Sequence, residues 1–197
     1  MENNTEKNRF LKIIGSEWAL GFLVAVLSVL IALAAYQSAI FDSKESDFNV
    51  EGQKLLTDSN GFYLEANQFV IYDYSMYDGW YINTDVNDEL AQYYSDSFSE
   101  NLTASMEREA GPFDDQYYTE MYADAEPQYD EAITNFESAQ QAGDKADRLQ
   151  LVVLVLAVGL ALAAYGSMIS EESKLRYVFA VLSIVSLVFG LMVYFTA

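Results

Sequence analysis

The sequence predicts a mainly α-helical integral membrane protein, with three transmembrane helices and an acidic, mostly helical extramembrane domain between the first two. Three segments, at residues 18–41, 149–169 and 177–197, contain no Asp, Glu, Lys or Arg. Each has the roughly 20 apolar residues that a helix needs to cross a bilayer. The net charge of −20 lies entirely between residues 42 and 148, where 25 acidic residues accompany five basic ones. One globular domain does not explain this segregation of apolar and charged residues, whereas spans that flank an exposed domain do.

These observations divide the chain into six parts: a cytoplasmic tail at 1–17, transmembrane helix 1 at 18–41, an acidic extracytoplasmic helical domain at 42–148, transmembrane helix 2 at 149–169, a cytoplasmic loop at 170–176 and transmembrane helix 3 at 177–197. Aromatic residues near the span ends fit the membrane interface, where amphipathic rings accumulate. They are Trp18, Tyr36, Tyr165, Tyr177 and Tyr194.

The first span also has features of a cleaved signal peptide, because basic residues precede it and small residues follow near Ala35 and Ala39. The apolar core of a signal peptide usually covers only 7–15 residues, and this run is longer. We therefore expect an uncleaved signal anchor. Basic residues are densest in the tail and in the short loop at 170–176, which favours a cytoplasmic location for both. The expected location is a prokaryotic plasma (inner) membrane.

Small residues form a stripe along the first span, at spacings of three and four. It comprises Gly21, Ala25, Ser28, Ala32, Ala35 and Ala39, and the second span repeats the rhythm at Ala157, Ala161 and Ala164. Small residues permit close backbone approach and are enriched at helix contacts in membranes. We expect the two stripes to pack against each other within one chain. The third span is then free for lipid or a partner through Ser183, Ser186 and Gly190.

The first half of the acidic block reads as an amphipathic helix that continues from the first span. Apolar residues recur there at helical spacing, namely Leu55, Phe62, Ala66, Phe69, Val70, Tyr74, Tyr77 and Tyr81. Asn60-Gly61 is a turn signal that weakens this interpretation, and the aromatic run 69–81 also suits strands. Residues 83–115 are expected to hold a loop, a short helix around 89–106 and another loop.

After Pro127 the helical pattern is clearer. Its stripe consists of Tyr129, Ala132, Ile133, Phe136, Ala139, Gly143 and Ala146. Proline suits the first turn of a helix, where its missing N–H is not needed. Only Gly143 interrupts the approach to the second span, so we expect an unbroken helix that enters the membrane. This returning helix and the outgoing one are expected to pack together as two stalk helices.

Composition excludes several kinds of chemistry. The chain has no His and no Cys, which removes the Ser-His-Asp arrangement, thiol catalysis and the usual zinc ligands. No phosphate-binding glycine motif or basic nucleic-acid footprint is present. The spans lack the ionisable residues that pumps and carriers normally need. We predict no enzyme activity and no cofactor, and we assign no catalytic, cofactor-binding or metal residues.

Two weaker signals concern binding. Carboxylates that hard cations prefer occur together at Asp114 with Asp115, and at Asp85 with Asp88 and Glu89, although without EF-hand spacing. A solvated acidic surface is the favoured interpretation, and a high-salt habitat would also select such a surface. An aromatic set suits a protein-binding face, although a core is the favoured interpretation. It comprises Tyr72, Tyr74, Tyr77, Trp80 and Tyr81.

The C-terminal half resembles a set of uncharacterised prokaryotic three-span membrane proteins with a helical stalk between span 1 and spans 2–3. The similar strings are Gly111-Pro-Phe-Asp-Asp, Tyr129-Asp-Glu-Ala-Ile and Gly143-Asp-Lys-Ala-Asp-Arg, the last leading into the second span. The short Trp-containing stretch of that set is represented only loosely by Gly79-Trp80. Because the function of the set is unknown, the resemblance implies an architecture and no activity.

The sequence therefore favours a structural, accessory or scaffold membrane protein. Its acidic domain would meet protein partners or, weakly, divalent cations. The alternative is a channel-like homo-oligomer whose pore is lined by small and hydroxyl residues such as Ser183 and Ser186.

Overall fold

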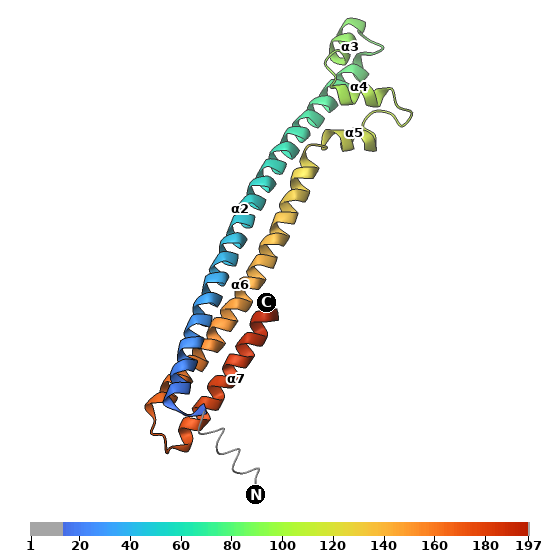
Figure 1. Cartoon of the computed structure of the whole chain (residues 1–197). Helices are drawn as coiled ribbons and strands as arrows, with labels where there is room; N and C mark the ends of the chain where they lie inside the picture. The colour runs from blue at the N-terminus through green and yellow to red at the C-terminus, as the bar shows by residue number, and fades with distance from the viewer. Residues whose placement is uncertain (1–13, 197) are drawn as a thin grey trace. The chain divides into compact units, whose positions relative to one another are not determined.

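The computed structural model describes residues 14–196, which are mainly helical and contain no strand. Six helices follow one another along the chain (Figure 1). They are α2 (Glu17–Asn83), α3 (Asp88–Ser95), α4 (Glu100–Met106), α5 (Asp115–Met121), α6 (Ala125–Met168) and α7 (Lys174–Thr196). Three of them, α2, α6 and α7, are long and apolar enough to cross a membrane, as the sequence predicts.

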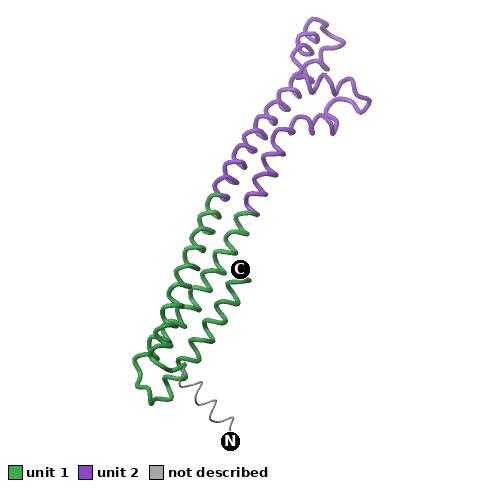
Figure 2. Tube along the Cα trace, viewed as in Figure 1, with its two compact units in different colours: residues 1–47, 138–197 green, residues 48–137 purple. Residues whose placement is uncertain are grey.

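The chain divides into two compact units, which Figure 2 distinguishes by colour. Unit 1 comprises residues 1–47 and 138–197, and unit 2 comprises residues 48–137. Helices α2 and α6 contribute residues to both units. The charge-free segments 18–41, 149–169 and 177–196 lie in unit 1, whereas α3, α4 and α5 lie in unit 2.

In unit 1 the three long helices share one apolar core. Its buried members are Leu20, Leu27 and Ala34 of α2, Val152, Leu156 and Ala163 of α6, and Ala180 of α7. Helices α6 and α7 approach closely at Gly159. There the Ser183 hydroxyl donates to the Gly159 carbonyl at 2.7 Å, and the Cβ of Ser186 leaves no room for a side chain on the glycine. Small residues thus bring these two backbones together, as expected for helices in lipid.

The expected packing of the small-residue stripes is wrong. Gly21 and the other five members of the α2 stripe are exposed, and a Cβ built on Gly21 meets nothing within 4 Å. Ala157 and Ala161 of α6 are exposed too. Larger residues one or two positions away, such as Leu20 and Leu27, fill the interior instead. They bury more apolar area, and the small face is left on the outside.

The face of the third span that carries Ser183 and Gly190, which we expected to be free for lipid or a partner, is not free. Ser183 and Gly190 of α7 are buried, with Gly190 against the side chain of Leu156. The Ser183 hydroxyl already bonds within the chain, because an unpaired hydroxyl in an apolar interior is costly. This face of α7 therefore packs on α6.

Arg176, counted above as a residue of the short loop, belongs to the first turn of α7 and is 1% exposed. Its Nε donates to the carbonyl of Gly15 at 2.6 Å, and its Nη1 to the carbonyl of Ile169 at 2.7 Å. Its Nη2 lies 3.8 Å from Glu171 and has no hydrogen-bond partner. The side chain thus joins the segments before α2 and after α6 to the start of α7.

In unit 2 the helical interpretation of the outgoing segment is confirmed. Helix α2 runs through Asn60-Gly61 and through 69–81 without a break. Gly61 lies exposed on its surface, where a glycine lowers helix stability by only about 1 kcal/mol. The returning helix is also continuous, with Pro127 in its first turn and Gly143 in its interior.

The two long helices pack together within unit 2, as expected for the stalk. A Cβ on Gly52 of α2 would lie 2.9 Å from the ring of Phe136 of α6, and the Ser59 hydroxyl donates to the carbonyl of Ala125 at 2.9 Å. Several apolar residues of the expected stripes are nevertheless exposed: Phe62, Phe69, Tyr74, Tyr81, Tyr129 and Ile133.

The region between the long helices differs from the expectation in two places. The single helix around 89–106 is two helices, α3 and α4, separated by residues 96–99, and α5 begins in a segment expected to be a loop. Each short helix has a polar N-cap, namely Asn87, Ser99 and Asp114, whose side chain accepts from a backbone N–H of the first turn.

Candidate functional site

A buried carboxylate organises unit 2. Asp73 of α2 is 0% exposed and accepts three hydrogen bonds. The donors are the backbone N–H of Ser99 at 3.1 Å, the Ser99 hydroxyl at 2.5 Å and the Tyr117 hydroxyl at 2.8 Å. Burying a carboxylate is costly unless it is fully hydrogen-bonded, and these donors satisfy it. Asp73 therefore joins α2 to the start of α4 and to α5.

This constellation does not resemble a catalytic one. The Ser99 oxygen also accepts from the N–H of Leu102, so it serves as the N-cap of α4. Burial and the hydrogen bond to Asp73 raise the pKa of Tyr117 far above its usual value, which keeps its proton in place as a donor. All three polar groups are thus engaged in holding elements together.

An ion pair closes the loop before α5. The Arg108 guanidinium donates to both oxygens of Asp114, at 2.7 Å and 2.8 Å, and the N–H of Tyr117 donates to Asp114 at 2.8 Å. The hydrogen bonds from Arg108 lower the pKa of the Asp114 carboxyl below its usual value. The same contact raises the pKa of Arg108. Bidentate pairs of this kind have a fixed geometry, so the pair defines the start of α5.

The Gly-Pro-Phe string has a structural role in the same loop. Gly111 has φ of +87° and Phe113 has φ of +61°, a conformation that residues with side chains seldom adopt. It places the centre of the Phe113 ring 4.2 Å from the centre of the Tyr74 ring and 5.1 Å from that of the Tyr117 ring. Aromatic packing there offsets the backbone strain.

The aromatic set expected as a face or a core divides between the two. Tyr77 packs against the cluster that contains Leu102 and Tyr117, and the Trp80 ring contacts that of Phe98. The hydroxyl groups of Tyr74 and Tyr118 are hydrogen-bonded to each other. This hydrogen bond, together with burial, raises the pKa of Tyr118 to about 12. Tyr72 and Tyr81 are exposed.

A separate apolar patch lies exposed at α3. Leu90 and Tyr93 are three residues apart on α3, so they share one side of that helix, and Val86 lies in the turn that precedes its N-cap Asn87. Val86 is 81% and Tyr93 64% exposed. Asp85, Asp88, Glu89 and Asp96 are their acidic neighbours in sequence. Apolar residues grouped in this way and surrounded by charge are typical of protein-binding sites.

The carboxylates considered for cations do not form a site. Asp114 is occupied by Arg108 and by a backbone N–H, so the pair with Asp115 offers only one free carboxylate. Asp85, Asp88 and Glu89 do not gather, and in residues 14–196 no three acidic side chains come close enough to hold a metal ion. Asp88 and Glu89 lie instead in the first turn of α3, where negative charge stabilises the helix.

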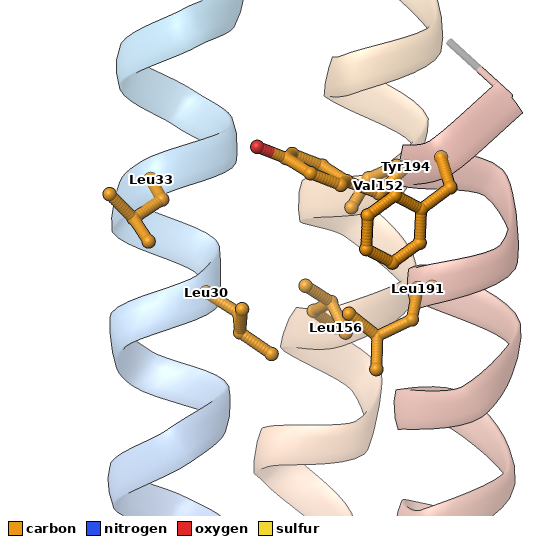
Figure 3. Close-up of a pocket in the computed structure, with 8 residues that line it drawn as sticks. Leu30, Leu33, Val152, Leu156, Leu191 and Tyr194 are labelled. Atoms are coloured by element: carbon orange, nitrogen blue, oxygen red, sulfur yellow. The ribbon is translucent and has the colours of Figure 1, made fainter.

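Unit 1 contains an apolar groove of about 100 Å³, shown in Figure 3. It is lined by Leu30 and Leu33 of α2, Val152 and Leu156 of α6, and Gly190, Leu191, Tyr194 and Phe195 of α7. Apart from the Tyr194 hydroxyl, these side chains offer only carbon to a bound molecule.

No protein-family model, curated protein or solved structure matches this chain. The resemblance to the three-span set thus remains a prediction.

The sequence analysis did not identify Asp73, although a signal was present. Ala66, Val70, Asp73 and Tyr77 recur at helical spacing, so one acidic residue interrupts an apolar stripe. Such a position indicates a buried, hydrogen-bonded acid.

Proposed function

We propose that the protein is a non-enzymatic, multi-pass protein of a prokaryotic plasma membrane, acting as an accessory or scaffold component. Residues 42–148 form its acidic extracytoplasmic domain, and the N-terminus is cytoplasmic. The three apolar helices of unit 1 support insertion into a bilayer. The basic residues of the tail and the short loop support this orientation.

The exposed patch of α3 carries the proposal of a binding role. Val86, Leu90 and Tyr93 are exposed in unit 2, and four acidic residues lie next to them in the sequence. Apolar side chains that a partner covers gain about 25 cal/mol per Å² of buried area. The surrounding negative charge favours a partner with a basic surface and speeds its association.

The test is photocrosslinking in cells, with a photoreactive amino acid at Val86 or Tyr93. The matched control is Gln68, which is exposed on α2 in the same unit. We expect one discrete crosslinked protein from the patch positions and none from position 68. Equal crosslinking at all three positions, or none at any of them, would contradict a binding role for the patch.

A homo-oligomer remains the second candidate, although in changed form. A pore lined by Ser183 is disfavoured, because that hydroxyl is buried and bonded to Gly159. The exposed small face of α2, around Ala25 and Ala32, instead suits close packing between copies. Crosslinked species at twice the mass of the chain would support this candidate.

A further inference from the structure

Unit 1 carries a second feature beside its apolar groove, at the end of the bundle where α7 stops. Arg148 of α6 lies four residues, or about one turn, before the groove residue Val152. Its Nη1 donates to the carbonyl of Thr196 at 3.1 Å, and Thr196 directly follows Phe195 of the groove. The guanidinium therefore lies at the mouth of the groove.

Two lysines add positive charge on the same stretch of α2 and α6. The Nζ atoms of Lys44 and Lys145 lie 5.2 Å and 5.5 Å from the centre of the Phe41 ring. Phe41 follows the groove residue Leu30 by eleven residues on α2. Eleven residues are close to three helical turns, so Phe41 lies on the same side of the helix.

Asp42, Glu45, Asp47, Asp144 and Asp147 lie on the same turns, yet none of the three cations forms an ion pair within the described part of the chain. The ion pairs there involve Lys54, Arg108 and Arg176, and not Lys44, Lys145 or Arg148. Asp144 precedes Arg148 by four residues, a spacing that suits a helical ion pair, yet the guanidinium turns to Thr196 instead. Three cations that form no ion pair in residues 14–196 lie beside an apolar groove, and this combination suits an anionic ligand with an apolar part.

We propose that this end of unit 1 binds one anionic phospholipid, with an acyl chain in the groove and the phosphate at Arg148, Lys145 and Lys44. The inference rests on the membrane insertion proposed above. From Leu156 to Arg148 the helix rises about 12 Å, at 1.5 Å per residue. One leaflet of a bilayer contributes about 15 Å of hydrocarbon. A groove at acyl-chain depth thus places these cations at the headgroups.

The shape of the groove fits this ligand. Leu33 is half exposed, so the groove opens to the side of the bundle, where lipid would lie. In Figure 3 the ring of Tyr194 projects from α7 with its hydroxyl directed toward α2. Tyrosine is enriched at the depth where acyl chains meet headgroups. A free anion, in contrast, would contact the three cations and would leave the apolar groove empty.

The experiment compares two lipids with the same acyl chains, dioleoyl phosphatidylglycerol and dioleoyl phosphatidylcholine, on the purified full chain in a neutral detergent. Native mass spectrometry counts the retained lipid. We expect the anionic lipid to bind about tenfold more tightly, since each basic residue near anionic lipid contributes measurably. Arg148→Gln or Lys145→Gln should each weaken its binding about fivefold, or about 1 kcal/mol.

Two further variants separate the charge from the groove. Leu33→Trp fills the groove and should lower the retention of both lipids. Lys54→Gln removes the same charge from an exposed pair with Glu51 in unit 2, and should change neither. Equal retention of the two lipids by the native chain, or equal losses in Lys54→Gln and Arg148→Gln, would overturn the proposal. So would displacement of the lipid by millimolar inorganic phosphate.

Carbonate washing of membranes distinguishes this proposal from the one on which it rests. A chain that the wash releases contradicts insertion, and the lipid site with it. A chain that stays in the membrane but binds the two lipids alike contradicts the lipid site alone.

Discussion

Gly159→Ala should destabilise the three-helix bundle, whereas Gly21→Ala should not. A Cβ at position 159 would lie 2.8 Å from the Cβ of Ser186, about half an ångström closer than an ordinary contact. The Ser186 Cβ is fixed to the backbone, so α6 and α7 must move apart. Overpacking of this kind costs about 1–3 kcal/mol. Replacing a helical glycine by alanine stabilises the helix by about 0.5–1 kcal/mol. The net loss of stability is therefore up to about 2.5 kcal/mol.

The matched control is Gly21→Ala, which makes the same substitution at a position without a clash. A Cβ at Gly21 meets nothing within 4 Å, so only the propensity gain of up to about 1 kcal/mol applies. The assay is unfolding of the purified chain in mixed micelles with increasing sodium dodecyl sulfate, followed by far-ultraviolet circular dichroism. If Gly21→Ala destabilises the chain as much as Gly159→Ala, the small face of α2 is interior and the described packing is wrong.

Three further predictions concern the rest of the chain. Asp73→Ala leaves three donors without an acceptor and should lower the free energy of unfolding of unit 2 by at least about 2 kcal/mol. The matched control, Asp78→Ala, changes an exposed residue and should have no such effect. Unfolding of both variants is followed by near-ultraviolet circular dichroism. Arg108→Gln should destabilise the chain at neutral pH. Because the folded pKa of Asp114 is lowered, this difference should fade as the pH falls below about 4, and a difference that persists there would contradict the pairing. Raising NaCl from low concentration to 0.1 M, where the screening length is about 10 Å, should raise the melting temperature by weakening acidic self-repulsion, and a fall would contradict that repulsion.

The helices were predictable because their signals are local. Two signals depend only on neighbours along one helix. They are the charge-free runs of 20 or more residues and the seven-residue spacing of Ala132, Ala139 and Ala146, which is about two helical turns. The prolonged apolar pattern at 69–81 also outweighed the turn signal at Asn60-Gly61, because a glycine within a long helix costs little once both sides pack.

Which face of each helix packs inward was not predictable from spacing alone. The small stripe at Gly21 and Ala32 and the larger residues Leu20 and Leu27 have the same periodicity, and only the neighbouring helices decide between them. The groove at Leu33 likewise needs three helices that are distant in sequence. Such features depend on tertiary contacts that no short window contains.

The central claim, three spans with residues 42–148 outside, is tested most directly by thiol labelling. The chain has no Cys, so Ser97→Cys and Ser173→Cys each introduce a single reactive thiol. A membrane-impermeant maleimide applied to intact cells should label position 97 and should reach position 173 only after lysis. Labelling of 173 but not of 97 would invert the topology, and labelling of both in intact cells would contradict three spans.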